Sequence, residues 1–106
     1  MKKTATSIKN NSHLEVLARQ FLLVGDYTRL KILCTIFNNN GACVSEITDT
    51  LRSNIAIISH HLQILHNAEL LTTKRDGKKI CYSLSKEPFL IDLKRLICKY
   101  NNLKNS

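Results

Sequence analysis

Residues 45–67 read Ser-Glu-Ile-Thr-Asp-Thr-Leu-Arg-Ser-Asn-Ile-Ala-Ile-Ile-Ser-His-His-Leu-Gln-Ile-Leu-His-Asn, and this stretch decides the fold. We expect a short helix over 45–51, with Ser45 as its N-cap. Its apolar side is formed by Val44, Ile47 and Leu51. A polar turn follows at 52–54, and a second helix is expected over 55–67. Two short helices joined by such a turn form a helix-turn-helix.

The second of these helices has two different faces. At about 100° per residue, one face is apolar and is formed by Ile55, Ile58, Leu62 and Leu65. The opposite face is formed by Ala56, Ser59, His60 and Gln63 and has no charged residue. Short neutral donors and acceptors suit the edges of bases in a major groove. On its own, however, such a face is more often an ordinary polar helix surface. We expect His61, which turns toward the protein, to be a packing histidine and not a metal ligand.

A basic hairpin follows the helix-turn-helix. Two strand-like runs, 70–75 and 79–84, flank Asp76-Gly77-Lys78, and Asp-Gly between such runs is a strong hairpin signal. The cations of this hairpin are Lys74, Arg75, Lys78 and Lys79. These side chains would contact phosphates if the preceding helix lay in the groove. A helix-turn-helix followed directly by a basic hairpin indicates DNA binding more specifically than either element alone.

Amphipathic helices flank these elements. Apolar residues at helical spacing predict one helix over 14–24 and another that begins at Asp26 or Thr28 and stops at 38–41. The latter places Cys34 inward. After Pro88 a terminal helix carries a long apolar stripe, formed by Phe89, Leu93, Leu96, Tyr100 and Leu103 and widened by Leu90 and Ile97. The core of so small a domain cannot cover the whole stripe. We therefore expect the uncovered part to pack against a second copy of the chain in a homodimer.

Composition and charge narrow the function. The 106 residues have room for one domain, which excludes a multidomain enzyme. Sixteen Lys and Arg against eight Asp and Glu give a net charge of +8, which indicates an anionic partner, with nucleic acid first. We expect a flexible polar arm over 1–12 and, without a long apolar run, a cytoplasmic protein with no membrane partner. Its cysteines are then expected to be thiols, metal ligands or redox sensors, not structural disulfides.

The order of these elements along the chain, and the wording of several of them, resemble the ArsR family of bacterial repressors over roughly residues 14–100. The matching phrases are Asp26-Tyr27-Thr28-Arg29-Leu30-Lys31-Ile32-Leu33, Val44-Ser45-Glu46-Ile47, Ser59-His60-His61-Leu62-Gln63-Ile64-Leu65, Ala68-Glu69-Leu70-Leu71 and Lys74 to Leu84. The resemblance implies an α+β, mainly α, winged helix-turn-helix over 13–106, with five helices and a two-stranded hairpin wing. It also implies a homodimer held by the first and last helices, which binds an imperfect palindrome and represses transcription until an inducer is sensed. No cofactor is expected.

The family's metal sites transfer poorly to this chain. Metalloid sensors carry Cys-x-Cys where this sequence has Cys43-Val44-Ser45, and a hydroxyl is a poor ligand for soft metals. Residues 88–103 contain Asp92 but none of the histidines that zinc and nickel sensors use there. A metal- or metalloid-responsive repressor using Cys43 and other thiolates stays the alternative.

Two other cysteines match the sulfide- and persulfide-responsive members of the family. Cys34 stands in Ile-Leu-Cys in the second helix, and Cys98 stands near the end of the last helix. The resemblance therefore implies a Cys34/Cys98 dithiol switch, in which Cys98 reacts first with a reactive sulfur species or oxidant and Cys34 resolves the product. A plain core role for Cys34 is the competing interpretation, because cysteine is often buried. Cys98 is predicted on the opposite side of its helix from Leu93, Leu96 and Tyr100. Cys43 and Cys81 are treated as incidental, although either could form a competing thiol pair.

Two other classes of protein are alternatives to a repressor. A thiol enzyme is disfavoured because there is no Cys-x-x-Cys, and none of His60, His61 and His66 is paired in sequence with an acid or nucleophile. A winged-helix protein-interaction module would show binding that does not change with salt. Within the repressor hypothesis, the base-facing residues are Asn54, Ala56, Ser59, His60 and Gln63, and the phosphate-facing residues are Lys74, Arg75, Lys78 and Lys79.

Overall fold

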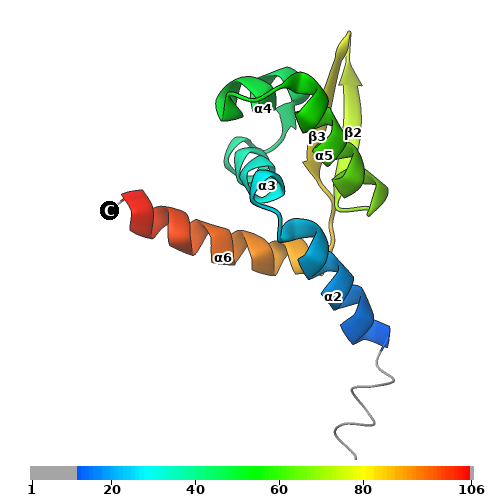
Figure 1. Ribbon diagram of the computed structural model, residues 1–106, viewed down its shortest axis with the longest axis vertical. Coiled ribbons are helices and arrows are strands. Elements are labelled where there is room, and N and C mark those ends of the chain that lie inside the picture. Colours follow the sequence, from blue (N-terminus) through cyan, green and yellow to red (C-terminus); the bar gives the residue numbers. More distant parts are fainter. Residues whose placement is uncertain (1–11, 106) are drawn as a thin grey trace, which may run out of the picture.

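The helix-turn-helix packs beside the hairpin strands in the structure, a computed structural model that describes residues 12–105 and the side chains of residues 12–100 (Figure 1). Helix α4 (Val44–Leu51) and helix α5 (Ile55–Asn67) are joined by a turn in which Arg52 takes a left-handed conformation, with φ 50°. The side chain of Asn54 caps α5, because its Oδ1 accepts the N–H of Ala56 at 2.7 Å. The predicted helix pair is confirmed.

Two details at the helix starts differ from the prediction. The N-cap of α4 is Cys43, not Ser45: the Cys43 N–H donates to Glu46 Oε1 at 2.8 Å, and the helix begins two residues earlier than predicted. Ile55 is 58% exposed, whereas Ile58, Leu62 and Leu65 are fully buried. The first residue of α5 lies beyond the edge of the core, and there it lines a surface crevice beside the hairpin instead of packing inward.

Helices α2 (Ser12–Val24) and α3 (Tyr27–Asn39) precede this pair. Helix α3 begins where the Asp26 side chain accepts the Arg29 N–H at 3.0 Å, and it ends at Asn40, whose φ is 53°. The predicted cap at Asp26 is confirmed. The core forms where α3, α4 and α5 meet, and its fully buried side chains include Ile32, Leu33, Ile36, Ile47, Ile58, Leu62 and Leu65. The predicted arm, 1–12, lies outside the described residues except for Ser12, the first residue of α2.

The hairpin forms part of a three-stranded antiparallel sheet. Strands β2 (Leu71–Asp76) and β3 (Lys79–Leu84) pair from Leu71↔Leu84 to Asp76↔Lys79, and the turn contains Gly77, with φ 63°. The short strand β1 (Ala42–Cys43) pairs with the other edge of β3, which gives the order β1-β3-β2. The predicted two-stranded hairpin wing is confirmed, and β1 adds a third strand that the sequence did not predict. A two-residue strand is too short to show alternation in the sequence.

Helix α6 (Pro88–Asn105) extends away from the body, and the wing and α2 lie toward opposite ends of the molecule (Figure 1). Leu90 and Leu93 are buried, and the Phe89 ring meets that of Phe21 edge-on, with centroids 5.3 Å apart. Leu96 and Tyr100, in contrast, are 51% and 62% exposed. Part of the apolar stripe is thus left uncovered by the protomer, as predicted. The side chain of Leu103 lies outside the described residues.

Across the described residues, these are five helices and three strands, an α+β fold that is mainly α. No helix within the described part of the chain is long and apolar enough to cross a membrane.

Candidate nucleic-acid interface and thiol groove

The outer face of α5 is exposed and uncharged. Ala56, Ser59, His60 and Gln63 are all exposed, as predicted. Gln63 Nε2 donates to Asn67 Oδ1 at 3.2 Å, which leaves the Gln63 carbonyl oxygen open to solvent-side donors. Asn54 differs from the others, because its Oδ1 serves the helix cap and only the rest of its amide faces outward. The face therefore offers neutral hydrogen-bonding groups of the kind that read base edges.

The wing brings cations next to this face. A crevice of about 290 Å³ is lined by Ser59 from α5, by Lys78 and Lys79 from the wing, and by Cys43. Lys74 and Arg75 are exposed on β2, the strand on the outer edge of the sheet, and do not line the crevice. Two of the four predicted cations thus adjoin the recognition face directly, and the other two lie one strand away.

A polar cluster fixes α5 against the start of α3. Arg29 Nη1 lies 3.2 Å from His61 Nδ1, and Arg29 Nε donates to the Leu23 carbonyl. His61 Nδ1 is also 4.0 Å from Asp26 Oδ2. Because a guanidinium group can only donate, this contact is a hydrogen bond in the tautomer in which His61 Nδ1 accepts. The predicted packing role of His61 is confirmed.

Asp26 is the group whose protonation this cluster changes. The Arg29 backbone N–H that it accepts at the helix cap, and the charge of Arg29 beside it, hold the pKa of the Asp26 carboxyl below its usual value of 3.8. The carboxylate therefore stays ionised at neutral pH and caps α3 in its charged form.

A second, larger groove of about 1050 Å³ lies between α2, α3 and α6. Cys34 and Cys98 both line it, and both are half-buried thiols. Cys34 was predicted to point into the core, but it faces this groove instead, because the core side of α3 is formed by Ile32, Leu33 and Ile36. Cys98 shares the groove with Leu93, Leu96 and Tyr100. The groove takes in more than one flank of α6, so this shared lining does not test on which side of the helix Cys98 lies.

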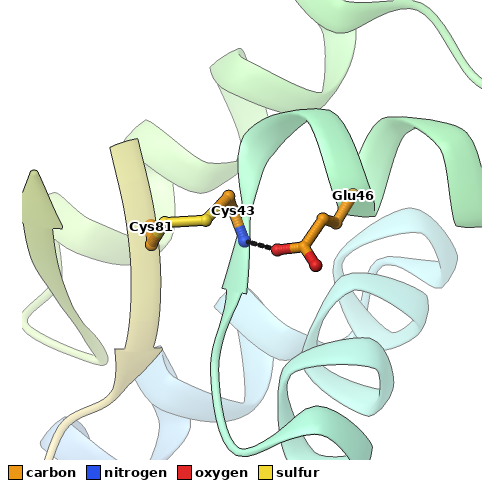
Figure 2. The surroundings of a disulfide bond; sticks show 3 residues. All are labelled: Cys43, Glu46 and Cys81. Atoms are coloured by element: carbon orange, nitrogen blue, oxygen red, sulfur yellow. Dashed lines mark hydrogen bonds between the residues drawn. A yellow bond between two sulfur atoms is a disulfide. The ribbon is translucent and has the colours of Figure 1, made fainter. Parts of the chain in front are cut away.

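The remaining two cysteines are joined. Cys43 of β1 and Cys81 of β3 form a disulfide (Figure 2). The expectation that the chain contains no disulfide is therefore wrong for this pair. They are 38 residues apart in sequence, and only the β1–β3 register, Cys43↔Cys81, brings them opposite each other. In this form Cys43 offers no thiolate to a metal, and the described residues contain no group of three or more His, Cys, Asp or Glu side chains that could hold one.

Comparison with known proteins identifies the family. Residues 26–73 match the model of the bacterial regulatory protein arsR family. Over 63 residues the chain is 40% identical to an uncharacterized HTH-type transcriptional regulator of Methanocaldococcus jannaschii, with 59% of this chain and 71% of that protein covered. The chain belongs to the arsR family. The suspected family and winged helix-turn-helix fold are thereby confirmed.

Other relatives of this arsR-family chain carry more specific names. It is 33% identical over 70 residues to a cadmium resistance transcriptional regulatory protein CadC homolog of Staphylococcus aureus, covering 66% of this chain and 58% of that protein. It is 35% identical over 65 residues to the transcriptional repressor SdpR of Bacillus subtilis, covering 61% of this chain and 71% of that protein. The chain thus spans somewhat more than half of the CadC homolog. These relatives are named as regulators, which agrees with the expectation that the chain is not an enzyme.

Solved structures share the fold. HlyU from Vibrio cholerae superposes with a TM-score of 0.78 at 21% identity, over 85% of this chain and 96% of that one. A homodimeric winged helix-turn-helix DNA-binding domain from Mycobacterium bovis superposes with a TM-score of 0.71 at 22% identity, over 86% of this chain and 82% of that one. At these identities the likeness establishes the architecture of this arsR-family chain.

Proposed function

We propose that this chain is a cytoplasmic, homodimeric transcriptional repressor that binds an imperfect palindrome in double-stranded DNA. The observation that carries this proposal is the crevice where the neutral face of α5 meets Lys78 and Lys79 of the wing. A recognition helix in the major groove and a cationic wing on the adjacent backbone divide the work between base edges and phosphates. Asn54, Ala56, Ser59, His60 and Gln63 face bases, and Lys74, Arg75, Lys78 and Lys79 face phosphates.

The apolar surface of α2 and α6 supports the dimer. Leu22 is 79% exposed on α2, and Ile91, Leu96 and Tyr100 are exposed on α6. Exposed apolar surface of this extent is typical of an interface. A solved structure of the same fold is described as homodimeric, and a twofold axis would place two α5 helices about one turn of DNA apart.

The shared groove supports a thiol switch at Cys34 and Cys98. We propose that the Cys98 thiolate attacks the sulfane sulfur of a hydropersulfide, RSSH, and releases RSH. The Cys34 thiolate then attacks the Cys98 sulfur and expels hydrogen sulfide. The net change is two protein thiols plus RSSH giving one disulfide, RSH and H₂S. A Cys34–Cys98 link would join α3 to α6, change the dimer frame and move the two recognition helices out of register.

The test starts from a duplex selected from a random-sequence library. We expect tight binding while Cys34 and Cys98 are thiols and the Cys43–Cys81 bond is closed, loss of binding after treatment with glutathione persulfide, and a Cys34–Cys98 link by mass spectrometry. Cys98→Ser should keep DNA binding and lose the response. A Cys98→Ser complex that is as sensitive as wild type removes the switch, and the absence of any salt-dependent duplex binding removes the DNA function.

A second candidate is a repressor that releases DNA on binding a thiophilic metal ion. The similarity to a cadmium resistance regulator favours it, and reduction of the Cys43–Cys81 bond would free two thiolates for such an ion. Stoichiometric, tight binding of Cd²⁺ by the reduced chain that Cys43→Ser abolishes would support this candidate. Micromolar or weaker binding would reject it.

A further inference from the structure

The Cys43–Cys81 bond lies where the wing joins the helix-turn-helix. Cys43 is both the last residue of β1 and the N-cap of α4, and its N–H donates to Glu46 (Figure 2). Cys81 lies within β3, one of the two wing strands. One covalent bond therefore connects the first residue of the DNA-reading unit to the wing that carries its cations.

The bond adds to the packing of α4 against β3 and of α5 against β2. Strand β1 pairs with β3 at two positions, Ala42↔Tyr82 and Cys43↔Cys81, and Cys43↔Cys81 is the pair nearer to the wing tip. Ala42 and Tyr82 are buried, whereas both cysteines are half-buried. The bond thus fixes the more exposed end of the two-residue pairing between β1 and β3. Beyond this pairing, the wing extends as a hairpin held by β2 and β3.

Cys43 is half-buried at the edge of a surface crevice. Cys43 lines the crevice that also contains Ser59, Lys78 and Lys79. A small thiolate is drawn toward a crevice that contains two ammonium groups, and thiol–disulfide exchange needs access of this kind to one sulfur. The same crevice is part of the proposed DNA-facing surface.

We propose that Cys43 and Cys81 form a reversible dithiol–disulfide site, exchanging with low-molecular-weight thiols and disulfides, that sets how firmly the wing is held beside α5. A thiolate RS⁻ attacks the Cys43 sulfur and releases the Cys81 thiolate. A second RS⁻ then attacks the mixed disulfide, which frees Cys43 and gives RSSR. Two RSH molecules supply the two electrons and the two protons that the protein thiols gain. The reverse reaction with RSSR restores the bond.

The direction of the effect on DNA follows from the position of the bond and rests on the proposed function. With the bond closed, Lys78 and Lys79 stay next to α5. DNA binding then loses less conformational entropy, because the wing is already held in place. Reduction frees the wing from this constraint and weakens DNA binding. Because coupling is reciprocal, bound DNA must also favour the disulfide, and it covers the crevice through which a thiol enters. This site therefore acts oppositely to Cys34 and Cys98, whose oxidation releases DNA.

The test uses the full chain with Cys34→Ser and Cys98→Ser, so that only the Cys43–Cys81 pair can react. Cys34→Ala with Cys98→Ala serves if the serine variant fails to fold. The chain is equilibrated in glutathione buffers of graded GSH to GSSG ratio, alkylated, and analysed by mass spectrometry. We expect an intramolecular Cys43–Cys81 link that forms and breaks reversibly across the series. The oxidised form should bind the selected duplex at least about fivefold more tightly, and bound duplex should slow reduction.

A matched control adds Cys43→Ser and Cys81→Ser, and its affinity should be the same in every buffer. Equal affinity of the oxidised and reduced forms overturns the inference, as does accumulation of separate glutathione adducts on the two cysteines without a link. If neither form binds any duplex, the proposed function itself fails, and the effect of this site on DNA fails with it.

Discussion

Gln63 and Lys78 represent the two kinds of contact expected at the DNA surface. Gln63 lies on the exposed face of α5, whereas Lys78 lies at the wing and lines the crevice beside Ser59. Gln63→Ala should cost about 1–3 kcal/mol of discrimination at one base pair. Lys78→Ala should weaken binding to all sequences alike and reduce the slope of log affinity against log salt by about 1. Affinities for a panel of single-base variants at several salt concentrations measure both effects.

Thr72→Ala is a matched control, because Thr72 is an exposed wing residue that is not assigned a DNA contact. It should leave discrimination and the salt slope unchanged. If Gln63→Ala and Lys78→Ala show the same pattern of loss, the division between base-facing and phosphate-facing residues is wrong.

Asp26 makes stability depend on pH. Its folded-state pKa is lowered, mainly by the Arg29 N–H at the cap, so its contribution is fully present above the unfolded value of about 3.8. The contribution is lost as pH falls through the lower folded-state pKa. Asp26→Asn keeps an N-cap acceptor but does not titrate. Thermal unfolding from pH 6 to pH 2 should therefore show a smaller decrease in Tm at the acid end for Asp26→Asn than for wild type, and identical curves would contradict this role.

At single residues, the sequence predicts the outer face of α5 better than the cap of α4. The exposed face of α5 follows from helical periodicity alone, and so does the inward position of His61. The N-cap of α4 was misplaced at Ser45 because Glu46 serves the N–H of Cys43, a residue whose position is set by the sheet. Cap positions that depend on tertiary pairing do not appear in a local pattern.

Among the elements, strand β1 has the largest effect on stability for its length. The disulfide that it carries closes a loop between residues 38 apart in sequence, and constraining such a loop in the unfolded chain is worth about 4 kcal/mol. Urea unfolding of the oxidised chain should therefore give a free energy of unfolding about 3–4 kcal/mol above that of the reduced chain. The Cys43→Ser, Cys81→Ser variant should match the reduced chain and should not respond to reductant. Equal stability of the oxidised and reduced chains would contradict this prediction.

Element boundaries show why this bond could not be predicted from the sequence. The hairpin and the helix-turn-helix carry strong local signals, namely Asp76-Gly77 and a polar turn between two amphipathic segments. Strand β1 has two residues and exists because it pairs with β3, far along the chain. The pairing of Cys43 with Cys81 follows from that long-range register, so no spacing rule could have identified it.

At the scale of the whole molecule, the apolar residues left exposed on α2 and α6 should hold two protomers together. Leu22→Glu and Leu96→Glu change exposed side chains, so the protomer fold should survive while the dimer dissociates. Sedimentation equilibrium should show a shift to monomer, with a loss of affinity for the palindrome. Ile80→Glu, at a 40% exposed apolar position on the wing, should remain dimeric. A persistent Leu22→Glu, Leu96→Glu dimer would place the interface elsewhere.

The proposed repressor releases DNA when Cys34 and Cys98 are joined. The most direct measurement follows DNA binding and the Cys34–Cys98 link in the same sample during titration with glutathione persulfide, with the Cys43→Ser, Cys81→Ser variant to isolate the pair. We expect that the fraction of DNA released equals the fraction of dimers in which the link has formed, and that Cys98→Ser abolishes both. Release of DNA without a Cys34–Cys98 link, or a complete link with DNA still bound, would contradict it.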